Sequence, residues 1–133
     1  MRTRVASLAC LLALALAGCG TADREDDAAA VVTRFHAALQ NRDGQAACAA
    51  LNAETASKLE SQEQKPCPRA VLSLELPKGG TVADTRVYVT SAFAQLAEGG
   101  TDFLDEGPDG WKVSAAGCKP SAPSQPYDCQ LEN

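Results

Sequence analysis

The sheet of this protein is specified most clearly by the stretch Gly110-Trp111-Lys112-Val113-Ser114-Ala115-Ala116. The apolar odd-numbered residues alternate there with Lys112 and Ser114, and a period of two is typical of a strand that buries one face. The preceding Gly107-Pro108-Asp109-Gly110 has proline second and glycine fourth, as a type I turn favours. We therefore predict a strand over residues 111–116, with its odd-numbered residues facing the core.

Three more strands are predicted before this one, over residues 81–89, 91–97 and 101–105. The first is rich in β-branched residues, which are common in strands. Glu98-Gly99-Gly100-Thr101 joins the last two, and paired glycines suit the positive φ angles of a hairpin turn. Consecutive strands with short turns predict an antiparallel meander that has one apolar face and one more polar face.

The first half of the chain is helical in pattern. A helix over residues 25–40 is predicted because its apolar residues recur on one face; they are Val31, Val32, Phe35, Ala38 and Leu39. Asp43 is a cap candidate for a second helix over residues 45–51. Asn52 precedes a third helix over residues 54–64, which Pro66-Cys67-Pro68 ends.

Residues 70–76 fit two interpretations. The leucines alternate with Ser73 and Glu75, which indicates a strand, whereas Pro68 suits the start of a short helix. We favour the helix. Residues 77–80, Pro-Lys-Gly-Gly, form a loop that divides the helical half from the sheet.

The N-terminus has the features of an export signal. Arg2 and Arg4 precede a 13-residue, mostly apolar run over residues 5–17, and small residues follow. This pattern is typical of a secretory signal peptide, and the run is shorter than the ~20 residues that a membrane span needs. We predict a signal peptide over residues 1–18, a polar tether over residues 19–26 and one domain over residues 27–133.

The exit from that segment, Leu16-Ala17-Gly18-Cys19, resembles the lipobox of bacterial lipoproteins. In that family the cysteine sulfur receives a diacylglycerol, the chain is cut before it, and the new amino group is usually acylated, for example by palmitate. The resemblance implies that Cys19 carries the lipid. The domain would then lie on the extracytoplasmic face of the cell membrane, with the membrane lipid as its first partner.

The cysteines predict a disulfide framework. Of six, Cys10 leaves with the signal peptide and Cys19 takes the lipid, so four remain in an exported chain. Three pairings are possible, and loop closure favours Cys48–Cys67 and Cys118–Cys129. The alternative is a zinc site, but gaps of 18, 50 and 10 residues are too wide for paired zinc ligands, so no metal is expected.

The charge excludes some partners. Loss of Arg2 and Arg4 leaves 10 Lys and Arg against 17 Asp and Glu, a net charge of −7. This balance, with only six aromatic residues and no basic stripe, argues against nucleic acid and against electrostatic docking on anionic lipid.

Three helices followed by a curved antiparallel sheet resemble the nuclear-transport-factor-2-like superfamily. Motifs that also resemble small bacterial lipoproteins of that fold are Val31-Val32-x-x-Phe35, Ala47-Cys48, Gly110-Trp111-Lys112-Val113, Ala116-Gly117-Cys118 and Pro126-Tyr127-Asp128-Cys129. The resemblance implies an α+β cone in which helices cross the concave sheet face and a pocket lies between the layers. Phe35, Phe103 and Trp111 are candidates for the pocket wall, although for Trp111 we favour a position in the core over one in the wall.

No catalytic set is visible in the sequence. The single histidine, His36, is expected to be half exposed at the edge of the helix stripe, too far from Asp27 or Asp43 to be oriented by them. Asp102 and Asp105 fall on opposite strand faces. His36 and Asp102 therefore remain weak candidates for catalysis.

The expected function is binding. We predict a non-catalytic module, without a cofactor, for an envelope protein partner or a small apolar ligand. The alternative is a small isomerase or dehydratase, since the superfamily includes both enzymes and binding modules and the fold does not assign a function.

The lipid anchor can be tested by one substitution. We expect Cys19→Ala to leave an uncleaved or soluble product without lipid, because the acceptor sulfur is gone. Intact-mass measurement of the protein from each cell fraction checks this, and normal acylation of the variant would contradict the prediction.

Overall fold

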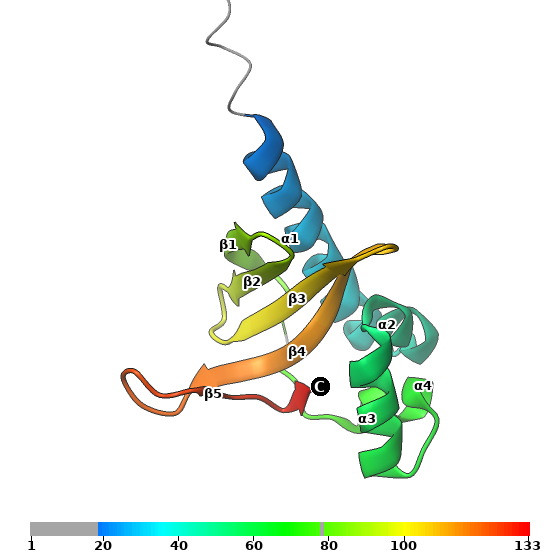
Figure 1. Ribbon diagram of the computed structural model, residues 1–133. Coiled ribbons are helices and arrows are strands. Elements are labelled where there is room, and N and C mark those ends of the chain that lie inside the picture. The colour runs from blue at the N-terminus through cyan, green and yellow to red at the C-terminus, as the bar shows by residue number, and fades with distance from the viewer. Residues whose placement is uncertain (1–18, 78) are drawn as a thin grey trace, which may run out of the picture.

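The computed structural model describes residues 19–77 and 79–133, so the expected signal peptide lies outside the described residues. The described chain is an α+β fold whose helices come first and whose antiparallel sheet follows (Figure 1). The helical elements are α1 (Cys19–Gln40), α2 (Gly44–Ala50), α3 (Ala53–Glu63), α4 (Cys67–Ala70) and the 3₁₀ turn η1 (Val71–Ser73). The predicted α+β class is confirmed.

The sheet follows the predicted meander. Its strands are β1 (Val82–Tyr88), β2 (Ser91–Leu96), β3 (Thr101–Gly107), β4 (Gly110–Pro120), β5 (Tyr127–Asp128) and β6 (Leu131–Glu132). They lie in the order β1-β2-β3-β4-β5, all antiparallel, and β6 also pairs with β4. Gly99 and Gly100 have φ of 91° and 99°, as the hairpin turn between β2 and β3 requires.

Helix α1 begins six residues earlier than predicted and includes the stretch expected to be a tether. The tertiary structure supplies the reason. The Arg24 guanidinium donates to the Val89 carbonyl, pairs with Glu106 and lies 5.4 Å from the Trp111 ring centroid. A helix rises about 1.5 Å per residue, so residues 20–26 span about 10 Å rather than the ~25 Å of an extended chain.

The short helices start where their caps predict. The Asp43 carboxylate accepts from the Ala46 N–H at 3.0 Å, and the Asn52 side chain accepts from the Thr55 N–H at 2.7 Å. These bonds satisfy backbone donors that have no partner within the helix. The helix favoured for residues 70–76 is shorter than expected, because it ends as η1 and Leu74 is extended.

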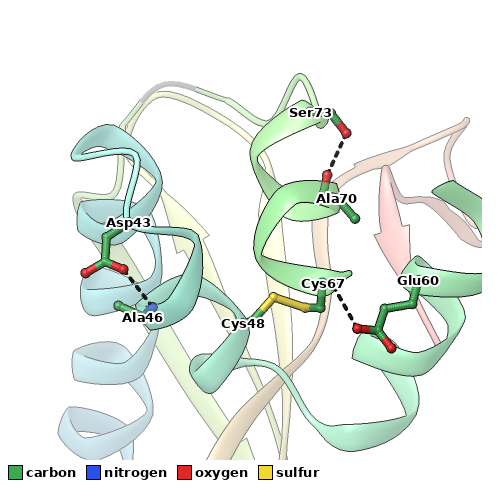
Figure 2. Close-up of a disulfide and its surroundings, with 7 residues drawn as sticks. All are labelled: Asp43, Ala46, Cys48, Glu60, Cys67, Ala70 and Ser73. Carbon is green, nitrogen blue, oxygen red and sulfur yellow. Dashed lines mark hydrogen bonds between the residues drawn. A yellow bond between two sulfur atoms is a disulfide. The ribbon is translucent and has the colours of Figure 1, made fainter. Parts of the chain in front are cut away.

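Both favoured disulfides are present. Cys48–Cys67 joins α2 to the first residue of α4, with Cα atoms 6.0 Å apart, and the Cys67 N–H donates to Glu60 of α3 at 2.8 Å (Figure 2). Cys118–Cys129 closes the C-terminal loop onto β4. Each bridge contributes on the order of 3 kcal/mol in the loop-closure model.

In β4 the side chains after Val113 do not face the sides of the sheet that the sequence predicts. Leu104 pairs with Val113 but Phe103 pairs with Ala115, so Ser114 is an extra residue and a bulge reverses the alternation. Ala116, rather than Ala115, is therefore buried. A second irregularity follows, where Thr101 pairs with Cys118, and bulges of this kind bend and twist a strand.

Packing between α2 and α4 predicts a sensitive glycine. A Cβ at Gly44 would collide with the Pro68 carbonyl oxygen, which the backbone holds in place. We expect Gly44→Ala to lower the free energy of unfolding by at least about 2 kcal/mol. Urea denaturation checks this against Gly107→Ala, whose Cβ would meet nothing within 4 Å; equal stability of the two variants would contradict it.

Candidate functional site

His36 is buried, contrary to the half-exposed position expected for it. Only 1% of its surface is accessible, because it continues the buried row of Ala28 and Val32 along α1 at intervals of four residues. The loop before β1 covers it from the other side. A Cβ at Gly80 would lie 2.5 Å from the His36 Cβ, so only glycine allows the backbone to approach this closely.

Asp102, the other weak candidate, is the partner of His36. The His36 Nε2 donates to the Asp102 Oδ2 at 2.6 Å, and the Gly117 N–H donates to Oδ1 at 3.0 Å. We assign the proton to Nε2 because an ionised carboxylate only accepts. Asp105 lies on the other face of β3, as predicted from the spacing, and accepts from the Ser91 hydroxyl.

This His36–Asp102 pair ties three elements together. It joins α1 to β3 and, through Gly117, to the bulged part of β4. Gly117 has φ of 66°, which glycine adopts at little cost. The sequence did not indicate the pairing, because the two side chains are 66 residues apart and the β4 bulges that bring in the Gly117 N–H have no local signal.

The interaction between His36 and Asp102 can be measured as a coupling energy. Removing one partner from a buried pair costs about 3–5 kcal/mol, because the other is left without its hydrogen bond. We expect His36→Ala and Asp102→Ala each to destabilise in this range, and the double variant to lose clearly less than their sum.

Chemical denaturation of the four proteins in this cycle gives the coupling, and Arg34→Ala, an exposed change on the same helix, is the control. Additive effects of the two substitutions would show that the side chains do not interact.

One pocket lies directly beside this pair, with His36 in its lining. It has a volume of about 380 Å³ and lies between the end of α1 and the segment that links α4 to β1. Its wall is formed by His36, Leu39, Gln40, Arg42, Val71, Leu72, Leu74, Leu76, Pro77 and Gly79. His36 contributes little of this surface, given its 1% exposure, so the pair lies behind the wall.

Arg42 lies at the rim of this pocket in an uncommon backbone conformation. It follows α1 with φ of 56°, where helices usually carry glycine. The Arg42 N–H donates to the Leu39 carbonyl and the Asp43 N–H to the Ala38 carbonyl, which completes the helix end. Among the described lining residues, Arg42 is the only arginine or lysine.

The three predicted pocket-wall residues share no pocket among those that the described residues form. Phe35 is fully buried in the core. Trp111 is also buried in the core, as favoured for it, and its remaining surface lines a separate, more polar groove of about 530 Å³ beneath Arg24. Phe103 lies on the opposite sheet face from Leu104 and packs on Phe93 and Tyr127. Successive side chains of a strand point to opposite faces, so an inward-facing Leu104 already predicts that Phe103 faces outward.

The sequence did contain a signal for the observed pocket. Leucines alternate with Ser73 and Glu75, a pattern that by itself predicts a strand or a short helix but not a pocket. In the structure the leucines line the pocket, while Ser73 and Glu75 are exposed. The alternation thus marks a partly extended segment with one apolar side.

Other kinds of site find little support in the described part of the chain. Within residues 19–77 and 79–133, no three His, Cys, Asp or Glu side chains gather as metal ligands would. None of the helices there has the length and apolarity of a membrane span. Comparisons of this chain with protein-family models, with curated proteins and with solved structures found no match in any of the three.

Proposed function

We propose that this protein is a lipid-anchored, extracytoplasmic binding module that holds a small apolar ligand. The observation that carries the proposal is the 380 Å³ pocket with its aliphatic wall. Ligand pockets usually measure about 300–1,000 Å³, with mostly apolar linings and a few polar groups. Burial of a ligand against five aliphatic side chains supplies the affinity through the hydrophobic effect.

The polar side chains at the pocket rim indicate the chemistry of the ligand's outer end. Arg42 and Gln40 are exposed and lie at the rim, whereas the leucines form the interior wall. A guanidinium favours an anionic group such as a carboxylate. The preferred ligand is therefore a small molecule with an apolar body and an acidic end.

The lipid anchor on Cys19 and the cone-shaped, nuclear-transport-factor-2-like fold are also parts of the proposal. The lipobox resemblance supports a lipid on Cys19, and α1 would then start at the membrane surface. Helices followed by an antiparallel meander with a bulged β4 support a curved, nuclear-transport-factor-2-like sheet. The lipobox resemblance and the arrangement of the strands are both independent of the pocket.

The burial of the His36–Asp102 pair favours binding over catalysis. Their side chains are 1% and 0% exposed, and both carboxylate oxygens already accept hydrogen bonds. A general acid or base must come within hydrogen-bond reach of its substrate. In this arrangement the pair holds the pocket wall in place.

A pocket-filling substitution tests the binding function. We expect Leu74→Trp to occupy the pocket and to remove a small molecule that co-purifies with the native chain. The full chain is extracted from its own membranes in one detergent, and bound compounds are identified by mass spectrometry after organic extraction.

The control is Glu75→Trp, which adds the same ring at the adjacent exposed position. A compound that is retained by the control and absent from Leu74→Trp supports the proposal. If all three proteins carry the same compounds in the same amounts, the pocket is not a ligand site.

An isomerase or dehydratase is the second candidate function, and the closeness of the His36–Asp102 pair to the pocket is the observation that favours it. Asp102→Asn keeps the size of the side chain and removes its charge. An enzyme would accumulate an unconverted substrate in this variant, so its co-purified compound would differ in identity from that of the native chain. A binding module would carry the same compound in both.

A further inference from the structure

The turn between β1 and β2 carries an exposed apolar side chain in a strained conformation. Val89 is 82% exposed and the preceding Tyr88 is 62% exposed. Val89 has φ of 53°, in the left-handed region. Side chains branched at Cβ rarely adopt this region, which glycine, asparagine and aspartate favour in two-residue hairpin turns.

The packing of the domain does not explain Val89. Its side chain lies largely in solvent, so it adds little to the core, and an asparagine there would fit the backbone better. Tyr88 stacks on Phe93, with ring centroids 6.1 Å apart, and still leaves most of its surface uncovered. The turn thus presents two apolar surfaces outward, at a cost in conformational strain.

The fold places this turn near the start of α1. The Arg24 guanidinium donates to the Val89 carbonyl and pairs with Glu106, so the turn is tied to the first part of the helix. Arg24 is five residues after Cys19, a rise of about 8 Å along a helix. Figure 1 shows α1 extending past the sheet at this N-terminal end.

We propose that the hairpin tip, defined as Tyr88 and Val89, inserts into the interface of the bilayer that holds the lipidated Cys19. This inference rests on the lipid anchor of the proposed function. Tyrosine favours the membrane interface, where its ring is buried and its hydroxyl stays hydrated. A valine beside it gains a partly apolar environment that water does not offer.

The anchor makes a contact of this small size effective. Once Cys19 is held in the bilayer, insertion of the tip is an intramolecular event at high effective concentration. The helical connection and the Arg24 contacts limit how far the tip can turn away. The result is a domain with a fixed orientation on the membrane.

The attraction is apolar rather than electrostatic. The exposed residues around the start of α1 include Asp23, Asp26 and Asp27, which anionic lipids repel. Insertion of the tip should therefore occur on neutral phosphatidylcholine. Anionic lipid should not strengthen it.

The experiment uses the full lipidated chain in phosphatidylcholine vesicles that contain a lipid with a photoreactive group near its headgroup. After illumination, crosslinked lipid is mapped to peptides by mass spectrometry, and intact mass first verifies acylation of Cys19. We compare the native chain with Val89→Asn and Val89→Leu. The turn at Gly99 and Gly100, which lies at the other end of β2, provides an internal reference.

We expect crosslinked lipid on the peptide that contains the hairpin tip, both in the native chain and in Val89→Leu. In Val89→Asn the yield should be at least fivefold lower, because the apolar side chain that the bilayer would bury is gone. Val89→Asn should unfold at an equal or higher temperature, because asparagine tolerates the left-handed backbone. Unfolding therefore cannot explain a lower yield.

A tip that stays unlabelled in an acylated native chain would overturn the inference and leave the anchor intact. A yield unchanged in Val89→Asn would overturn it too, since the valine would then be irrelevant. A native chain without lipid on Cys19 would instead remove the anchor itself.

Discussion

The buried carboxylate of Asp102 is the constraint on which the rest of the structure depends. A polar group in the core is destabilising unless its hydrogen bonds are made. Asp102 makes them with His36 and with the Gly117 N–H, both of which come from other elements. The rotation of α1 about its axis and the left-handed turn at Gly117 are therefore fixed together.

The pocket is a consequence of the same arrangement. With His36 turned into the core and Gly80 packed against it, the segment before β1 has to cross the end of α1 closely. A Cβ at Gly117 would meet the Leu76 side chain at 2.9 Å, so this leucine lies on the β4 bulge. The leucine wall thus packs against the elements that the His36–Asp102 pair joins.

Helix α1 also separates the two ends of the molecule. Leu39 lines the pocket and Cys19 starts the helix, so twenty residues, or about 30 Å of helix, lie between them. The proposed ligand site is then at the far end of α1 from the proposed anchor. Arg24 holds the near end against the sheet, through Val89 in the turn between β1 and β2 and through Glu106 near the end of β3, which makes the helix a stiff connection.

The sequence by itself determined those features that depend on neighbouring residues. The caps at Asp43 and Asn52, the glycine hairpin at Gly99 and Gly100, the meander and both short-range disulfides follow from local spacing and turn chemistry. Each involves groups close in the chain, so loop closure and backbone preference largely decide it.

Only the tertiary structure decided the early start of α1, the β4 bulges, the burial of His36 and the position of the pocket. The His36–Asp102 and Arg24–Glu106 contacts join residues 66 and 82 positions apart, and no local pattern selects such partners. Their geometry depends on how α1 packs on the sheet. Burial of apolar surface drives that packing without specifying which polar groups meet.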